Sequence, residues 1–361
     1  MSQQLGRTAD SDQLAGTRCA FELAGERNPA GLRETRFRFA GMPVRMHVVG
    51  PALHDILARA FASLIDREEV VATAADSLVI RAWDRAHTGV GCPGIPRAPD
   101  RTDVLGPGLM SQYDGGRVLR YDRATITKTI DRTSNEIFIC VEDAEKLRLN
   151  DRTKPFPHFL ATWYFDRGVQ LLHAGLVSKN GQGVLIGGTG GSGKSTTSIA
   201  CALAGFDFLG DDTVGTVIRE DGCFGYACYN AVRSAARNIE WFPDLQAASH
   251  LLPATPDDKG KVLTYMSEVS SVSTVPGVAI AGIVVPTVIG SGPTEIATAP
   301  GGVTLRKLAP STLLRGLGGG TTGFAHMAQL TRVLPCFALT LGDSVRDVPR
   351  VVGQLLEDLA Q

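Results

Sequence analysis

Apolar and polar residues alternate along several short segments of the first 150 residues. The run from Arg36 to Val49, RFRFAGMPVRMHVV, alternates on both sides of a Gly-Met-Pro turn, which predicts two strands of a half-buried hairpin. Apolar residues then recur at helical spacing over Pro51–Ile65, and a proline near the start also favours a helix there. Further strands are predicted at Ser77–Trp83, Val118–Tyr121, Ala124–Ile130 and Glu136–Val141.

Two stretches interrupt this pattern. Ala86–Gly116 is rich in glycine, proline and aspartate and has no periodicity, so we predict a mobile loop or an insertion there. Leu149–Pro157, LNDRTKPFP, is polar and contains two prolines. We place a domain boundary in it, which predicts a smaller α+β domain over residues 1–150 and a second domain over residues 151–361.

The second half of the chain alternates short apolar strands with helices, which is the pattern of an α/β layered domain. A helix is predicted at His158–Arg167, closed by Gly168, and the strand Gln170–Val177 follows it. The most apolar stretch, Val275–Ile289, is too short and too interrupted by glycine and proline to span a bilayer, so we predict buried strands there. A last helix is predicted at Val351–Leu359.

Composition narrows the classes of function. The 361 residues carry 36 basic and 37 acidic side chains, so the chain lacks the basic surface that nucleic acid or anionic lipid would require. Seven cysteines, none in CxxC spacing, fit a disulfide framework or a zinc site poorly. The polar first residues lack the apolar stretch of a secretory signal. We therefore expect a cytoplasmic protein that binds neither nucleic acid nor membrane.

The most specific motif lies in VLIGGTGGSGKSTTSIACALAG, where the residues match G-x-x-x-x-G-K-[ST] between a predicted strand and a predicted helix. Glycines can adopt backbone angles that point successive N–H groups at a phosphate, which lies at the positive end of the helix. The lysine would neutralise the β- and γ-phosphates, and the serine after it would ligate Mg²⁺. The motif predicts ATP and Mg²⁺ as cofactors, bound by Gly188, Thr189, Gly190, Gly191, Ser192, Gly193, Lys194, Ser195 and Thr196.

Two adjacent carboxylates follow the next predicted strand, Phe206–Leu209. Asp211 lies seventeen positions after Lys194, so one helix and one strand return Asp211 and Asp212 to the sheet edge that holds the phosphates. One carboxylate can hold the metal while its neighbour faces the acceptor. His173, on the strand Gln170–Val177 that precedes the strand leading into the glycine-rich loop, is either a core residue or a phosphate contact.

These three pieces in this order, LLHAGLVSKNGQGVLIGGTGGSGKS followed by FLGDDTV, resemble the C-terminal catalytic domain of HPr serine kinase/phosphorylase. The resemblance implies an α/β P-loop domain of the HPr-kinase and phosphoenolpyruvate-carboxykinase type, in which His173 contacts phosphate and Lys194 serves catalysis. It further implies that Ser195 binds Mg²⁺, that Asp211 transfers the proton, and that Asp212 binds metal or supports the site. The chain also looks like divergent relatives that phosphorylate a precursor peptide on serine.

The resemblance has a limit. The family's segment resembling Glu-Val-Arg-Gly-Leu-Gly is not found after Asp212, and neither is its later arginine segment. HPr as the substrate and the reverse phosphorylase reaction are therefore not carried over to this chain.

Cations beyond Lys194 are expected near a transferred phosphoryl group, because negative charge spreads over its oxygens. Arg233 and Arg237 are four positions apart, so on a helix they would share one face, which either contacts phosphate or acceptor or is simply solvated. Lys259, Lys261 and Arg306 are weaker candidates.

Taken together, the sequence predicts an ATP- and Mg²⁺-dependent kinase that phosphorylates a hydroxyl, with serine or threonine of a peptide or protein as the favoured acceptor. A small alcohol or amino acid as the acceptor, a non-enzymatic ATP-binding regulatory protein, and a phosphoenolpyruvate carboxykinase relative stay open as alternatives. The N-terminal domain is assigned to acceptor binding or assembly, and a homo-oligomer is compatible with the resemblance. The sequence names neither the acceptor nor the nucleotide base.

Overall fold

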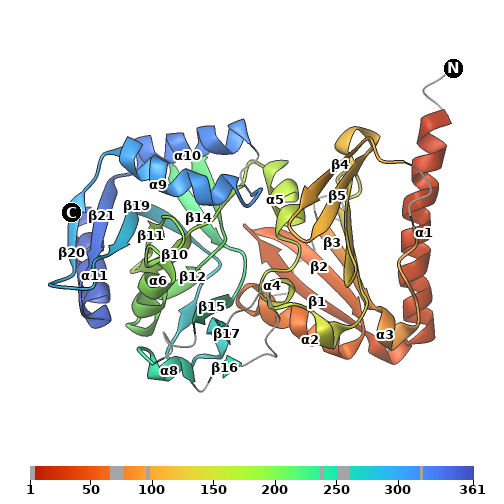
Figure 1. The fold of residues 1–361 in the computed structure, drawn as a ribbon, viewed down its shortest axis with the longest axis horizontal. Helices are drawn as coiled ribbons and strands as arrows, with labels where there is room; N and C mark the ends of the chain where they lie inside the picture. Colours follow the sequence, from red (N-terminus) through yellow and green to blue (C-terminus); the bar gives the residue numbers. More distant parts are fainter. Residues whose placement is uncertain are drawn as a thin grey trace. The chain divides into compact units, whose positions relative to one another are not determined.

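The computed structural model describes residues 5–65, 77–94, 98–235, 240–246, 248–250, 261–317 and 320–361. Residue contacts divide the chain into two compact units, and each unit mixes helices with a large β-sheet (Figure 1). The first unit comprises Met1–Arg38, Met42–Arg59 and Ile65–Arg152, and the second comprises Phe39–Gly41, Ala60–Leu64 and Thr153–Gln361. Among the described helices, none combines the length and the apolar character that crossing a membrane requires.

An eight-stranded sheet forms the first unit, in the order β1-β2-β3-β8-β7-β6-β5-β4. The predicted hairpin is confirmed, but it turns at Ala40 and Gly41, which have φ angles of 49° and 81°, and Met42 and Pro43 already belong to β2. The other four predicted strands are confirmed to within a few residues. The strands are β1 Leu32–Phe39, β2 Met42–Val49, β3 Leu78–Asp84, β4 Arg101–Leu105, β5 Gly108–Tyr113, β6 Val118–Arg123, β7 Ile126–Asp131 and β8 Glu136–Val141.

Helix α1 (Leu5–Arg27) packs on this sheet, and further helices follow along the chain. It contacts β2 and β3, and the rings of Phe21 and Trp83 have centroids 6.3 Å apart. The predicted helix after the hairpin is α2 (Pro51–Ala60), which ends five residues earlier than expected and continues as a short 3₁₀ turn. Helix α4 spans Leu149–Thr153.

The prediction of a loop or insertion at Ala86–Gly116 is wrong for much of this segment, although residues 89–94 and 98–100 form no helix or strand. Helix α3 (Arg85–Thr88) begins this segment, and β4 and β5 later form an antiparallel hairpin that turns at Gly106 and Pro107. Strand β4 is largely exposed along its length, so its side chains lack the apolar and polar alternation that reveals a half-buried strand. Residues 95–97 lie outside the described part of the segment.

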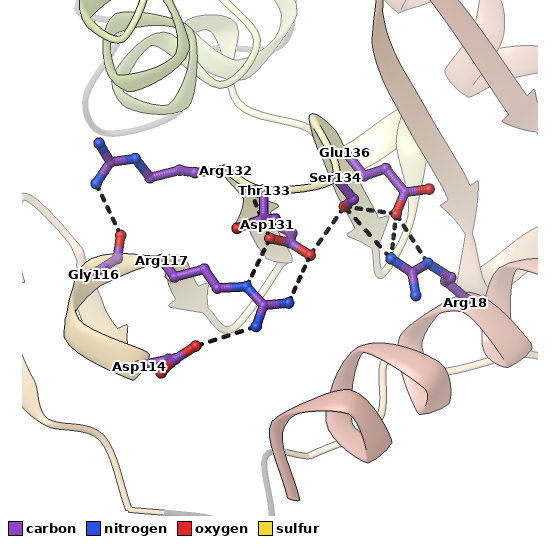
Figure 2. Close-up of polar contacts among 9 residues, drawn as sticks. All are labelled: Arg18, Asp114, Gly116, Arg117, Asp131, Arg132, Thr133, Ser134 and Glu136. Carbon is purple, nitrogen blue, oxygen red and sulfur yellow. Dashed lines mark hydrogen bonds and ion pairs between the residues drawn. The ribbon is translucent and has the colours of Figure 1, made fainter. Parts of the chain in front are cut away.

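Two buried carboxylates link α1, β7 and β8 of the first unit, as Figure 2 shows. Asp131 accepts hydrogen bonds from the Arg117 guanidinium at 3.3 and 3.4 Å and from the Ser134 hydroxyl at 3.0 Å. Arg18 of α1 donates through Nε to Glu136 at 2.9 Å. Burial raises the pKa of Asp131, but the hydrogen bonds from Arg117, the Thr133 N–H and Ser134 outweigh it and hold this pKa below its ordinary value.

Replacing Asp131 with asparagine should lower the free energy of unfolding by about 1 to 3 kcal/mol at neutral pH, because it removes a charged acceptor of several hydrogen bonds. The pKa of Asp131 is lower in the folded than in the unfolded protein. Its stabilisation is therefore complete above the unfolded pKa and is lost as pH falls through the folded pKa, where Asp131→Asn and wild type should converge. Urea unfolding across this pH range measures the difference. Asp103→Asn, which removes an exposed ion pair with Arg101, should change stability by less than about 0.5 kcal/mol; an equal loss there would contradict the prediction.

The second unit contains a ten-stranded sheet. Eight of its strands follow the order β18-β12-β10-β11-β19-β14-β13-β9, and β21 pairs with both β19 and β20. Strands β12 and β11 are both antiparallel to β10, while β19 is parallel to β11 and β21 is parallel to β19. The carboxyl ends of β11, β12, β19 and β21 therefore meet at one edge of the sheet. The strands are β9 Gln170–Leu172, β10 Gly175–Lys179, β11 Gln182–Ile186, β12 Asp207–Gly210, β13 Val214–Arg219, β14 Gly222–Ala227, β18 Ser273–Thr274, β19 Gly277–Val288, β20 Glu295–Thr298 and β21 Cys336–Leu341.

Helices cover both faces of this sheet (Figure 1). Helices α6 (Lys194–Leu203) and α11 (Val348–Leu359) share one apolar cluster with Val184 and Ile186 of β11. Helices α9 (Gly301–Leu313) and α10 (Thr321–Val333) pack together, and Leu308 lies against Gly187. The predicted helices over α6 and α11 are confirmed, as is the helix α5 (Pro157–Phe165), and the apolar stretch 275–289 forms the single strand β19.

Three short strands form a separate small sheet in the second unit, in the order β15-β17-β16. Their bounds are β15 Ala231–Ala235, β16 Ser249–His250 and β17 Lys261–Tyr265, and the short helix α8 spans Pro243–Gln246. Strand β15 contacts α6, which brings this small sheet to the same end of α6 as the glycine-rich loop.

Candidate functional site

The glycine-rich loop joins β11 to α6 at the sheet edge where four strands end. Gly188, Gly191 and Gly193 have φ angles of 145°, 80° and 104°, a region that favours glycine. A Cβ atom on Gly193 would lie 2.3 Å from Leu341 Cδ1, so a larger residue at the start of the helix would have to displace the Leu341 side chain. The loop thus has the backbone freedom and the helix N-terminus that an anion cradle requires.

Lys194 folds back over this loop. Its Nζ atom donates hydrogen bonds to the carbonyl oxygens of Gly188 at 2.9 Å and Thr189 at 3.0 Å. The side chain is buried, and this burial holds the pKa of Lys194 below its ordinary value, although the nearby Asp211 carboxylate raises it. The ammonium group is therefore held at the loop, where it can meet an incoming anion.

Asp211 follows β12 and lies 4% exposed beside the loop. Among the described residues, its Oδ1 atom has no hydrogen-bond partner. Burial raises the pKa of Asp211, against a hydrogen bond from Ser195 and the positive charges of Lys194, Lys154 and Arg233. A carboxylate in these surroundings takes up a proton more readily than an ordinary aspartate, which suits a general base.

Asp212 has a different environment, because basic side chains converge on its carboxylate. Lys154 forms an ion pair with its Oδ2 atom, and Arg233 and Arg315 each lie 3.5 Å from the same oxygen. Asp211 is a second carboxylate beside these cations. Among the described residues that line the cavity, Lys154, Lys194, Arg233 and Arg315 outnumber the two aspartates, and this local positive charge favours binding of an anion.

His173 lies in a bend between β9 and β10, so the prediction of one continuous strand over Gln170–Val177 is wrong. The chain changes partners at this bend, because β9 pairs with β13 while β10 pairs with β11 and β12. The backbone N–H of His173 donates to the Thr312 hydroxyl at 3.0 Å, and the ring Nδ1 lies 2.8 Å from both the backbone carbonyl oxygen and the carboxylate Oδ1 of Asp212. Burial, together with the charges of Arg315, Lys194, Lys154 and Arg233, lowers the pKa of His173 to about 2.

The imidazole of His173 should therefore be neutral throughout the physiological pH range, with its proton on Nδ1, because a carbonyl oxygen can only accept. NMR spectra of the ¹⁵N-histidine-labelled protein without ligand should show this tautomer unchanged from about pH 8 to pH 5. The resonances can be assigned by their loss in His173→Gln. A His173 ring that titrates near the ordinary histidine pKa would contradict the prediction.

The prediction that Arg233 and Arg237 share a helical face is wrong for Arg233, which lies in strand β15. Val232 and Ser234 are both buried, and β15 pairs along its length with β17, so cross-strand pairing decides the conformation here. Arg233 nevertheless belongs to the site, because its guanidinium forms an ion pair with the Asp212 carboxylate. Arg237, Lys259 and the side chain of Lys261 lie outside the described residues, and Arg306 lies exposed on α9, away from the lining of the cavity.

Sequence reasoning missed two site residues, Lys154 and Arg315. Lys154 belongs to the segment that we interpreted as a domain boundary, and Arg315 follows α9. Neither lies in a recognisable motif, and only the fold brings them to Asp212. These groups lie around an open cavity of about 160 Å³, which is lined by Thr153, Lys154, His173, Gly190, Gly191, Lys194, Ser195, Asp211, Asp212, Ala231, Arg233 and Arg315.

No protein-family model matches the sequence, and none of the curated proteins matches it. Among solved structures, the chain is similar to the Hpr(Ser) kinase/phosphatase from Coxiella burnetii, at 13% sequence identity over 52% of this chain and 95% of that chain. The TM-score of this match is 0.27, which is too low to assign a fold or a function.

Proposed function

We propose that the second unit is an ATP- and Mg²⁺-dependent kinase, similar in design to HPr serine kinase/phosphorylase, that phosphorylates a hydroxyl group. Serine or threonine of a peptide or protein is the favoured acceptor. One observation carries the proposal: the 160 Å³ cavity joins the lysine of the glycine-rich loop, a buried carboxylate and a cluster of cations. Charge neutralisation and proton removal at one position are what phosphoryl transfer to a hydroxyl needs.

The residues of the site fit both a triphosphate and Mg²⁺. The hydroxyl of Ser195 lines the cavity beside Lys194 and is a hard oxygen ligand of the kind that Mg²⁺ prefers. Ser195 would hold the ion together with phosphate oxygens. Once bound, Mg²⁺ would supply further neutralisation of the charge on the transferred phosphoryl group.

Asp211 is the proposed general base. Its carboxylate takes the proton of the acceptor hydroxyl, the hydroxyl oxygen forms a bond to the γ-phosphorus, and the bond from this phosphorus to the ADP oxygen breaks. Because burial raises its pKa, Asp211 loses its basic form at a higher pH than an ordinary aspartate would. The transfer rate should therefore fall on acidification.

Asp212 has the supporting role in this proposal. Its carboxylate accepts from Lys154, Arg233 and Arg315, and its backbone carbonyl holds the His173 ring. Three neighbouring cations would repel a divalent metal, which argues against Asp212 as the main ligand of Mg²⁺. The same cations and Lys194 are placed to stabilise the charge of the transferred phosphoryl group.

Transfer from γ-labelled ATP tests the proposal. Wild-type protein with Mg²⁺ is incubated with a library of serine- and threonine-containing peptides and, separately, with small alcohols and hydroxy amino acids, and the products are identified by mass spectrometry. Label in a stable phosphoester of a peptide is the expected result. Label in small molecules alone would show that the acceptor is a small alcohol or hydroxy amino acid and not a peptide. ATP binding without any labelled acceptor would favour a regulatory ATP-binding protein.

A further inference from the structure

A second cavity of about 700 Å³ shares Gly191, Lys194 and Ser195 with the smaller one. Its other walls come from the segments that follow β19 and β21 at the same sheet edge, from the start of α11, and from Trp241. The two cavities thus meet at the glycine-rich loop. All of these residues belong to the second unit.

The walls of the larger cavity are mainly apolar. Trp241 and Val288 are 54% and 56% exposed, although side chains of this kind are usually more buried, and Leu341 and Val348 add buried apolar side chains to the lining. Asp343 and Ser344 add a small number of polar groups to the lining. An apolar cleft with an exposed aromatic ring and few polar groups is typical of a site for a flat, partly polar organic ligand.

The volumes of the two cavities decide how a nucleotide would lie. Small-molecule sites usually measure about 300 to 1,000 Å³, a range that includes the larger cavity and excludes the smaller one. A triphosphate held at the loop is covalently joined to its nucleoside, and of these two cavities the larger has room for the nucleoside. The γ-phosphate, at the end of the triphosphate remote from the nucleoside, would then lie in the smaller cavity, next to Asp211.

We propose that the larger cavity binds the nucleoside of the nucleoside triphosphate, with its base stacked on Trp241. This inference rests on the proposed function, since it requires the loop to bind the triphosphate. It assigns to Trp241 a direct contact with the ligand and fixes the direction of the bound nucleotide across the loop. Stacking of a base on an aromatic ring strengthens binding without hydrogen bonds that would distinguish one base from another.

The test compares two ligands that share phosphates and differ in the nucleoside. Calorimetry measures the affinity of wild type, Trp241→Ala and Lys194→Met for MgATP and for Mg²⁺ with inorganic tripolyphosphate. We expect Trp241→Ala to weaken ATP binding about tenfold and to leave tripolyphosphate binding within about twofold, because only ATP has a base to stack. Phe324→Ala, which removes an exposed aromatic ring from α10, is the matched control and should change neither affinity.

Intrinsic fluorescence gives an independent readout. Trp83 and Trp163 are 0% and 1% exposed, so a change on ligand addition should come from Trp241. ATP should change the emission of wild type but not of Trp241→Phe, and tripolyphosphate should change neither.

The outcomes separate the inference from the proposed function. Equal ATP affinity in wild type and Trp241→Ala would overturn the inference alone, provided that Lys194→Met still loses both ligands. Equal loss of ATP and tripolyphosphate in Trp241→Ala would also overturn it, because the ring would then act on the loop and not on the base. Binding of neither ligand by wild type would overturn the proposed function, and the inference with it.

Discussion

Replacing Asp211 with asparagine should lower the rate of phosphoryl transfer about 10²- to 10⁴-fold, which is the usual contribution of a general base. Asparagine has nearly the same shape as aspartate but cannot take up the proton of the acceptor hydroxyl. The affinity for ATP should stay the same or rise, because the change removes a negative charge next to Lys194, where the phosphates are expected to bind.

Steady-state transfer and equilibrium ATP binding, measured on the same preparation, separate these two effects. Asp207→Asn is the matched control, since Asp207 lies at the opposite end of β12 and accepts a hydrogen bond from Ser178 at 3.3 Å. It should retain the wild-type rate. If Asp211→Asn kept its transfer rate within tenfold of wild type, Asp211 would not be the base.

Replacing Lys194 with methionine should abolish both functions of the loop. Methionine preserves the length of the side chain but removes the charge that the proposal assigns to the phosphates. We expect transfer to fall by about 10³-fold or more and ATP affinity to fall by at least about tenfold. The hydrogen bonds to Gly188 and Thr189 are also lost, so thermal melting must show that the variant is folded.

Lys179→Met is the matched control for Lys194→Met. Lys179 lies at the end of β10 that is remote from the loop, and it approaches Glu357 at 3.9 Å. It should bind ATP and transfer phosphate as wild type does. Retention of ATP binding by Lys194→Met would show that the triphosphate binds elsewhere.

Local patterns carried most of what the sequence could predict. The hairpin between β10 and β11 follows from Asn180 and Gly181, which have φ angles of 54° and 77°. The strand, loop and helix around Lys194 follow from spacing within about twenty residues, and the strand before Asp211 follows from a short apolar run. Each of these elements is decided by near neighbours, so one sequence suffices to find it.

Features that depend on distant partners were not predictable in the same way. Lys154 and Arg315 reach Asp212 from segments that are far apart in the chain, and no spacing relates them. Arg233 lies in a strand because β17 pairs with it, although its spacing to Arg237 also suits a helix. Helix α1 escaped prediction because its apolar residues, among them Leu14, Phe21 and Ala24, are mostly small and follow no strong helical periodicity.

The structure of the complex with Mg²⁺ and a non-hydrolysable ATP analogue is the most direct test of the central claim, that the smaller cavity is where the phosphoryl group is transferred. The proposal predicts the γ-phosphate in this cavity, in contact with Lys194 and within reach of Asp211 and His173. A nucleotide bound away from the loop, or one whose γ-phosphate points away from Asp211, would contradict the proposal.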